Sequence, residues 1–210
     1  MMDHLDDIYD AIIDGDKNGT VESVKAALAD GLSPKEILND GMIAAMDEVG
    51  RLFEETEIFV PEMLVAARAM KAGLELLRPY LVKSGIEPAG KVVLGTVQGD
   101  MHDIGKNLVG MMLEGAGFEI VDLGVDVAPE KFIEALQGEV DILGMSALLT
   151  TTMVSMEKTV KAIEAAGLRH KAKIMVGGAP VTEEFAKHIG VDGYAGDASQ
   201  AVTIAKALLA

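Results

Sequence analysis

The segment from Gly99 to Gly105 reads Gly-Asp-Met-His-Asp-Ile-Gly and brings one histidine, two carboxylates and two glycines together. The chain contains no cysteine, so histidine and carboxylate side chains are its only strong protein ligands for a metal. The segment therefore predicts a site for a metal or for a charged ligand.

The residues on either side of this segment predict where it lies in the fold. The apolar run from Lys91 to Val97 is typical of a buried strand, and Ile104, Leu108 and Met112 recur at helical spacing after it. The segment thus marks the point where a strand turns into a helix. In an open α/β sheet, ligands bind at that end of the strands.

The two halves of the chain differ in hydrophobic periodicity. Residues 1–82 show helical spacing only and predict a four-helix bundle, with Ser33, Pro34 and Glu36 as the start signal of its third helix. The stretch 83–90, with two glycines and a proline, is the expected linker.

Residues 91–210 alternate short apolar runs with amphipathic stretches, which is typical of an α/β fold with a doubly wound, five-stranded parallel sheet. We expect a Rossmann-like domain with the flavodoxin-like strand order, in which the first strand lies beside the third. The expected strands lie near 91–97, 119–123, 140–145, 173–177 and 192–195, and the expected helices near 103–116, 129–137, 152–166, 182–188 and 197–209.

Small and polar residues follow two further strands of this expected sheet. The third strand ends in Gly144 to Thr152, which is rich in hydroxyls, and the fourth ends in Gly177, Gly178 and Ala179. Glycines at such ends let a ligand approach the backbone closely. Each feature also has a purely structural explanation: a surface or capping histidine, a tight turn at the glycines, and an N-cap at Thr150 to Thr152.

The net charge of −16 argues against nucleic acid and anionic membranes as partners, because both require clustered Lys and Arg. No uninterrupted apolar stretch is long enough to span a bilayer, and the acidic start Met1 to Asp7 does not fit a signal peptide. We therefore expect a cytoplasmic protein in a reducing compartment.

The segment Gly99 to Val109, Gly-Asp-Met-His-Asp-Ile-Gly-Lys-Asn-Leu-Val, resembles the Asp-x-His-x-x-Gly signature of the corrinoid (cobalamin-binding) proteins of methyltransferase systems, a family that includes the cobalamin domain of methionine synthase. Ser146-Ala147-Leu148 and Gly177-Gly178 resemble its second and third elements. Gly41 to Met46 and Phe59 to Leu64 resemble its helical cap. The resemblance covers nearly the whole chain.

The resemblance implies that His102 replaces dimethylbenzimidazole as the lower axial ligand of cobalt. It implies that Asp100 hydrogen-bonds the other ring nitrogen, fixes the tautomer and raises its basicity, and that Thr152 continues the relay where the family more often has serine. It also implies a role for Asp100 in coupling proton uptake to the redox state of cobalt. Asp103 is expected to be a helix N-cap.

The remaining cofactor-binding residues also follow from the resemblance. Gly105 would leave room under the corrin, and Met101 and Ile104 flank the ligand. The displaced nucleotide tail would enter a crevice bounded by Ser146, Leu148, Thr150, Gly177 and Gly178. Phe53 and Val60 match the two apolar positions with which the cap shields the upper face, although both also fit an ordinary bundle core.

The function that the resemblance implies is a methyl carrier, which works between a substrate-specific methyltransferase and a second methyltransferase acting on tetrahydrofolate or a thiol coenzyme. A corrinoid reductive activator is a further expected partner. Because no substrate barrel is apparent, other chains are expected to catalyse the complete reaction, and the linker would act as a hinge. Three alternatives stay open: a cobalamin-dependent sensor, the cobalamin subunit of a mutase, and a phosphate-responsive or flavin-binding protein.

Overall fold

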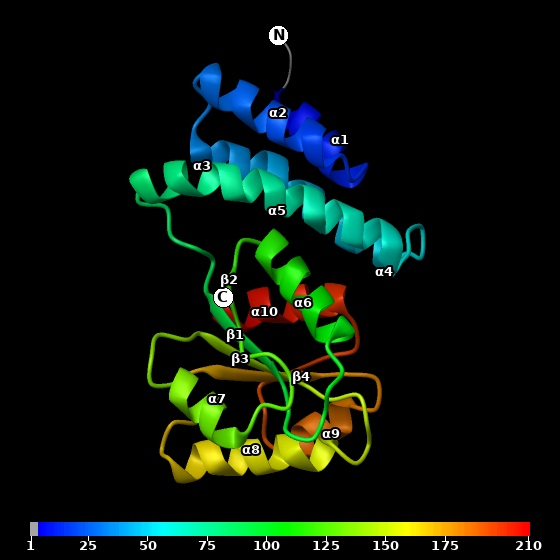
Figure 1. Cartoon of the computed structure of the whole chain (residues 1–210), viewed down its shortest axis with the longest axis vertical. Coiled ribbons are helices and arrows are strands. Elements are labelled where there is room, and N and C mark those ends of the chain that lie inside the picture. The colour runs from blue at the N-terminus through cyan, green and yellow to red at the C-terminus, as the bar shows by residue number, and fades with distance from the viewer. Residues whose placement is uncertain (1–3) are drawn as a thin grey trace. The chain divides into compact units, whose positions relative to one another are not determined.

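The structure is a computed structural model and describes residues 4–210. The first three residues of the acidic start, Met1 to Asp3, lie outside the described part. The chain divides into two compact units: one comprises the residues up to Ala89 together with Glu114–Gly117, and the other comprises Gly90–Leu113 and Phe118–Ala210. The first unit is helical, and the second is built around a sheet (Figure 1).

The helical unit contains four helical stretches, as the apolar spacing predicts. They are α1 (His4–Ile13), α2 (Lys17–Ala29), a continuous stretch made of α3 (Pro34–Glu36), the π-helical segment η1 (Ile37–Ile43) and α4 (Ala44–Glu54), and finally α5 (Val60–Lys83). The core of this unit includes the fully buried side chains of Ile8, Ile12, Val24, Met42, Met63 and Leu77.

The third helical stretch begins at the predicted capping box. The Ser33 hydroxyl accepts a hydrogen bond from the Glu36 backbone N–H (3.2 Å), and the Glu36 carboxylate accepts one from the Ser33 N–H (3.1 Å). The wide turn of η1 is a difference from the sequence prediction, because the apolar spacing there predicts an ordinary α-helix. Gly41 lies in this turn, and a side chain there would contact Ile8.

The sheet unit contains the predicted five parallel strands. They are β1 (Lys91–Thr96), β2 (Glu119–Asp122), β3 (Ile142–Ser146), β4 (Lys173–Gly177) and β5 (Gly193–Ala195), in the order β2-β1-β3-β4-β5. This confirms the expected position of the first strand beside the third. Thr96 pairs with Ser146, and Ser146 pairs with Gly177, so the carboxyl ends of β1, β3 and β4 lie side by side.

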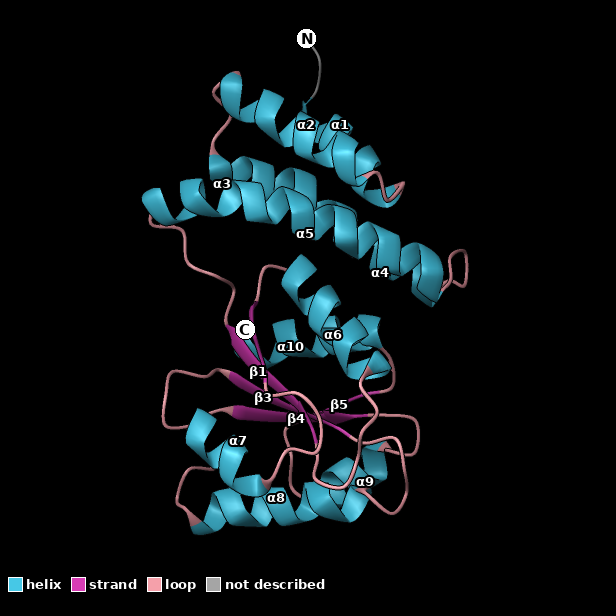
Figure 2. Cartoon of the chain, in the orientation of Figure 1, coloured by secondary structure: helices cyan, strands magenta, loops and turns pink. Residues whose placement is uncertain are grey.

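Helices cover both faces of the sheet. They are α6 (Ile104–Gly115), α7 (Pro129–Ala135), α8 (Met153–Ala165), α9 (Glu183–His188) and α10 (Ala198–Leu209). Helices α6 and α10 lie on one face, and α7, α8 and α9 lie on the other (Figures 1 and 2). Because side chains alternate along a strand, Val93 joins the core beneath α7 and α8, whereas Leu94 points to the opposite face, where it lies close to Gly110 of α6.

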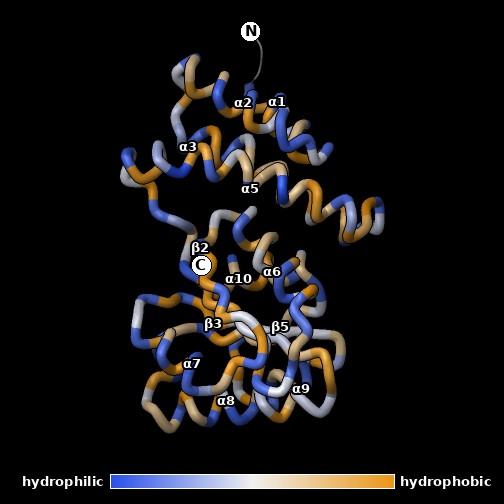
Figure 3. Tube along the Cα trace, viewed as in Figure 1, coloured by the Kyte–Doolittle hydropathy of each residue, from blue (hydrophilic) through white to orange (hydrophobic). Residues whose placement is uncertain are grey.

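Hydropathy along the chain agrees with this layering. In Figure 3 the strands of the sheet carry hydrophobic runs, whereas hydrophobic and hydrophilic residues alternate along the helices. Among the described residues, no helix combines the length and apolar character needed to cross a membrane. The α/β fold with a helical N-terminal part is therefore the one that the sequence predicts.

Candidate functional site

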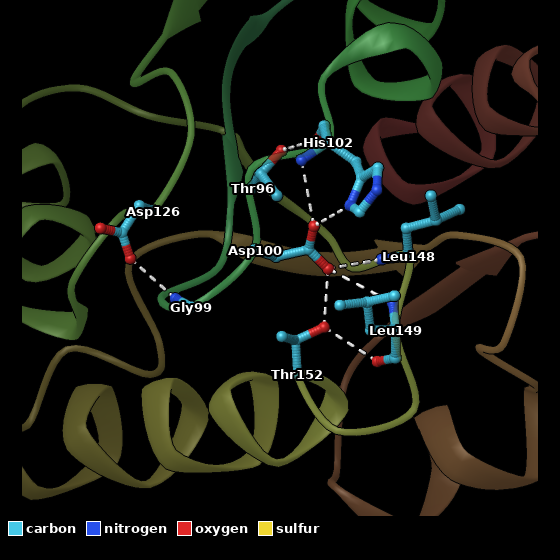
Figure 4. A network of polar contacts seen from close by, with 8 residues as sticks. All are labelled: Thr96, Gly99, Asp100, His102, Asp126, Leu148, Leu149 and Thr152. Atoms are coloured by element: carbon cyan, nitrogen blue, oxygen red, sulfur yellow. Dashed lines mark hydrogen bonds and ion pairs between the residues drawn. The ribbon is translucent and has the colours of Figure 1, made fainter.

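The loop between β1 and α6 carries the aspartate and histidine singled out in the sequence. Asp100 is completely buried, whereas the His102 side chain is half exposed. The two side chains point toward each other (Figure 4). A buried carboxylate thus lies behind an accessible imidazole.

Both oxygens of the Asp100 carboxylate are occupied by donors. Oδ1 lies 2.7 Å from Nδ1 of His102 and accepts the His102 backbone N–H at 3.1 Å. Oδ2 accepts the Thr152 hydroxyl at 2.6 Å and the backbone N–H groups of Leu148 and Leu149 at 2.8 and 3.3 Å. The loop after β3 therefore holds the carboxylate that in turn holds His102.

These contacts keep Asp100 ionised. Burial works to raise the pKa of the Asp100 carboxyl, but the hydrogen bonds from Thr152, Leu148 and His102 together outweigh it and hold this pKa well below its usual range. An ionised carboxylate only accepts hydrogen bonds, so Nδ1 of His102 carries the proton. In the neutral imidazole, Nε2 is then left with the lone pair that a metal needs.

Thr152 has a role that differs from ordinary helix capping. It lies directly before α8, yet its side chain makes no hydrogen bond to the backbone of that helix. Its hydroxyl lies 2.6 Å from Asp100 and 2.8 Å from the Leu149 carbonyl. Since it has one proton, the charged and closer acceptor takes it. The alternative that this side chain only caps a helix is therefore wrong.

Exposed apolar side chains lie close to His102 in the chain and in the β3–α8 loop that holds Asp100. Met101 is 67% exposed, Ile104 is 81% exposed and Leu148 is 42% exposed. Gly105 lies in the first turn of α6, and a Cβ atom added to it would meet no protein atom within 4 Å. The side of the loop that bears His102 thus offers apolar surface and open space to a ligand.

The glycines after β4 have a reason within the fold. A Cβ atom on Gly178 would lie 1.9 Å from the Ala147 carbonyl oxygen, and one on Gly177 would lie 2.8 Å from that of Ala195. Gly178 also has a φ of +126°, which favours glycine. These glycines therefore allow close packing against the backbone of Ala195 and Ala147 in the same chain.

The other predicted site residues have the following places in the structure. Ser146 is the last residue of β3, and Thr150 is exposed in the loop between β3 and α8. Asp103 precedes α6, and its carboxylate accepts a hydrogen bond from the Asn107 amide at 3.1 Å. In the helical unit, Phe53 lies near the end of α4 and is partly exposed, and Val60 is the 38% exposed first residue of α5.

Sequence reasoning missed three residues that hold the loop. The Thr96 hydroxyl donates to the His102 carbonyl at 2.9 Å, and Asp126 accepts the Gly99 N–H at 2.7 Å (Figure 4). Lys106 is buried and pairs with Asp122 at 2.6 Å, which joins α6 to the end of β2. A lysine on the apolar side of a predicted helix is the one signal that could have pointed to such a pair.

His102 does not belong to a metal centre built by protein side chains alone. Within residues 4–210, no group of three or more His, Cys, Asp or Glu side chains is placed to hold a metal ion. The site around His102 thus offers a metal one imidazole nitrogen from the described side chains.

Comparisons with known proteins agree with this arrangement. A B12 binding domain model matches residues 90–203, and a second B12 binding domain model matches residues 4–78. The chain is 40% identical to a corrinoid protein of Desulfitobacterium hafniense, over 100% of this chain and 99% of the relative. It is 44% identical to dimethylamine corrinoid protein 3 of Methanosarcina acetivorans, over 98% and 96%.

A solved structure gives the same result. The methanol:cobalamin methyltransferase complex of Methanosarcina barkeri contains a similar chain, with a TM-score of 0.87 and 33% identity over 99% of this chain and 80% of that one. The sequence matches and the shared fold lead to one conclusion: this chain belongs to the B12-binding corrinoid proteins of methyltransferase systems, and its cofactor is a corrinoid.

Proposed function

We propose that this protein is a methyl carrier that holds its corrinoid in the base-off, histidine-on state, with Nε2 of His102 as the lower axial ligand of cobalt. The observation that carries the proposal is the pairing of a buried, ionised Asp100 with a half-exposed His102 at 2.7 Å. This pairing directs the lone pair to the ring nitrogen that is not bound to the carboxylate.

The residues around His102 fit such a cofactor. Imidazole nitrogen is a suitable ligand for a transition metal of this kind, and the exposed side chains of Met101, Ile104 and Leu148 match a large, mostly apolar ring. Gly105 provides space that no protein atom fills. When bound, the corrinoid supplies a cobalt centre that accepts a methyl group and later gives it up.

The protein's own residues would prepare the ligand. Asp100 holds the proton at Nδ1 of His102, and Thr152 and the Leu148 N–H stabilise the charge of Asp100. For the nucleotide tail of the cofactor we propose a crevice that includes Ser146, Leu148, Thr150, Gly177 and Gly178. Gly177 and Gly178 would act there by letting the neighbouring loops pack closely, because both glycines make such approaches in the fold.

The helical unit would protect the methyl-bearing face of the cofactor. We propose that residues 1–82 form this cap, that 83–90 is a hinge, and that Phe53 and Val60 supply the shielding apolar groups. Their partial exposure supports this role, since a side chain that only fills the bundle core is normally buried.

Two methyltransferases and a reductive activator are the partners that this function requires. The relatives named above are a dimethylamine corrinoid protein and a methanol:cobalamin methyltransferase complex, which supports a substrate-specific methyltransferase as the first partner. The second methyltransferase would deliver the methyl group to tetrahydrofolate or to a thiol coenzyme.

Cobalamin binding tests the ligand assignment. Protein carrying 15N-labelled histidine is loaded with hydroxocobalamin and reduced to the cobalt(II) form, whose electron paramagnetic resonance spectrum shows an extra two-line splitting when a histidine nitrogen is bound axially and a three-line splitting when the cofactor's own base is bound instead. We expect the two-line splitting in the wild type and its loss in His102→Ala, with much of the binding retained. His170→Ala, which removes an exposed histidine in the turn before β4, is the matched control. Equal spectra for the wild type and His102→Ala would contradict the assignment.

Methyl transfer tests the carrier role. The protein is loaded with methylcobalamin carrying a labelled methyl group and mixed with a purified methyltransferase that uses tetrahydrofolate or a thiol coenzyme. We expect the label to move to the acceptor only when both proteins are present. A chain that binds cobalamin but keeps its label with every acceptor enzyme tested would contradict the carrier role and favour a sensor.

A further inference from the structure

Asp126, in the loop between β2 and α7, makes two contacts with the loop that carries His102. Its carboxylate oxygen Oδ1 accepts a hydrogen bond from the Gly99 N–H at 2.7 Å. Its own backbone N–H donates to the Asp100 carbonyl at 2.9 Å. One residue thus holds the Gly99–Asp100 dipeptide at both of its ends.

The backbone of Asp126 is in an uncommon conformation. Its φ is +53°, in the left-handed region that costs free energy for most residues and is tolerated best by Gly, Asn and Asp. Gly99 opposite has a φ of +88°. A residue at position 126 must therefore accept this conformation and also supply a short side-chain acceptor, and only Asp and Asn meet both conditions well.

The contacts of Asp126 complement those of Thr152. The β3–α8 loop holds the carboxylate of Asp100, as described above. The β2–α7 loop instead holds the backbone there, at the Gly99 N–H and at the Asp100 carbonyl. The two loops approach Asp100 from different sides (Figure 4). Together the two loops hold both the backbone and the carboxylate of Asp100 in the position where Oδ1 meets Nδ1 of His102.

We propose that Asp126 is a positioning residue for corrinoid binding: it fixes the Gly99–Asp100 backbone so that Asp100 holds His102 in the orientation that binds cobalt. This inference rests on the proposed ligation by His102. Asp126 does not touch the cofactor in this proposal, and it acts through Asp100 alone. Its effect should therefore appear in the strength of the bond between His102 and cobalt.

Asp126→Gly separates positioning from folding. Glycine accepts the left-handed backbone without strain, so the fold keeps its loop, but the acceptor for Gly99 is lost. Asp126→Asn keeps both the conformation and a side-chain oxygen, and it should behave like the wild type. Asp141→Gly is the matched control, because Asp141 brackets Lys91 in the same way, with bonds of 2.7 and 3.0 Å, at the opposite end of β3.

The readout is the pH at which His102 leaves cobalt in protein loaded with hydroxocobalamin and reduced to the cobalt(II) form, followed by the visible spectrum and by the splitting from the histidine nitrogen. Protons compete with cobalt for Nε2, so weaker ligation moves this midpoint to higher pH. Substituting groups that orient a metal ligand typically weakens binding by about 10–100-fold. We expect the low end, about tenfold, for Asp126→Gly, which corresponds to a rise of about one pH unit.

Two results would overturn the inference. One is a pH midpoint in Asp126→Gly equal to that of the wild type or of Asp141→Gly. The other is rapid hydrogen exchange of the Gly99 amide in the wild type, a measurement that does not depend on the folding of any variant. If the wild type itself shows no axial nitrogen from His102, the proposed function fails instead. The two failures are therefore distinguishable.

Discussion

At the scale of single residues, Asp100 is the group on which the site depends most. It is a buried carboxylate that accepts hydrogen bonds at both oxygens. Asparagine has the same shape but only one oxygen, so its NH2 group must face donors on one side. We expect Asp100→Asn to lower the free energy of unfolding of the protein without cofactor by about 2 kcal/mol, because hydrogen bonds to a buried charge are lost.

Urea unfolding at neutral pH measures this effect. Asp103→Asn is the control, since the exposed carboxylate of Asp103 accepts only a 3.1 Å bond from the Asn107 amide among the side-chain contacts of the described residues. The control should stay within about 0.5 kcal/mol of the wild type. An equal decrease in the free energy of unfolding in both variants would mean that the hydrogen bonds of Asp100 add no stability beyond that of its charge.

The residues that the sequence could predict are those carried by one local motif or by a strand end. Asp100 and His102 are two residues apart, and strand order predicted that the hydroxyl-rich end of the third strand lies beside them, whereas the choice of Thr152 within that end came from the family resemblance. Asp126 was missed because its role depends on a left-handed backbone and on contact with a loop 27 residues away. Neither property can be recognised from a short stretch of sequence.

At the scale of elements, the start of the third helical stretch gives a test in the helical unit. Hydrogen bonds from Ser33, first from its hydroxyl and then from its backbone, lower the pKa of Glu36 below its ordinary value. Ser33→Ala removes the hydroxyl. We expect the pKa of Glu36 to rise toward its ordinary value and, since an N-cap is lost, the free energy of unfolding to fall by about 1 kcal/mol at neutral pH.

The pH dependence of this difference has a definite sign. A carboxylate whose pKa is lowered by folding stabilises the protein above its ordinary pKa, and this contribution is lost as the pH falls through the folded-state pKa. The gap in stability between the wild type and Ser33→Ala should therefore narrow below about pH 4. NMR titration of the Glu36 carboxyl and urea unfolding at several pH values check both parts; a gap that widens in acid would contradict the account.

Strands and helix starts were predictable because hydrophobic spacing and capping residues encode them locally. The first strand was expected at 91–97 and spans Lys91–Thr96, and Ser33 begins its helix. The wide turn at Ile37–Ile43 was not predictable. Its apolar residues keep a spacing that suits an α-helix, and the turn involves packing of Gly41 near Ile8 on another helix.

At the scale of the whole molecule, the proposed roles of the two units can be separated by the regions that the cofactor protects. All residues proposed to bind cobalt and the nucleotide tail lie in the sheet unit. Hydroxocobalamin should therefore slow hydrogen exchange in the loop 97–103 and in the β3–α8 loop.

The same experiment tests the proposed cap. Loop amides exchange through local opening, so their protection reports contacts near them rather than global stability. If Phe53 and Val60 shield the cofactor, the loop 55–59 between α4 and α5 should also gain protection, whereas the loop 14–16 between α1 and α2 should not change. Protection confined to the sheet unit would leave the His102 site intact but contradict a shielding role for the helices, because a cap that covers the cofactor cannot do so without losing solvent access itself.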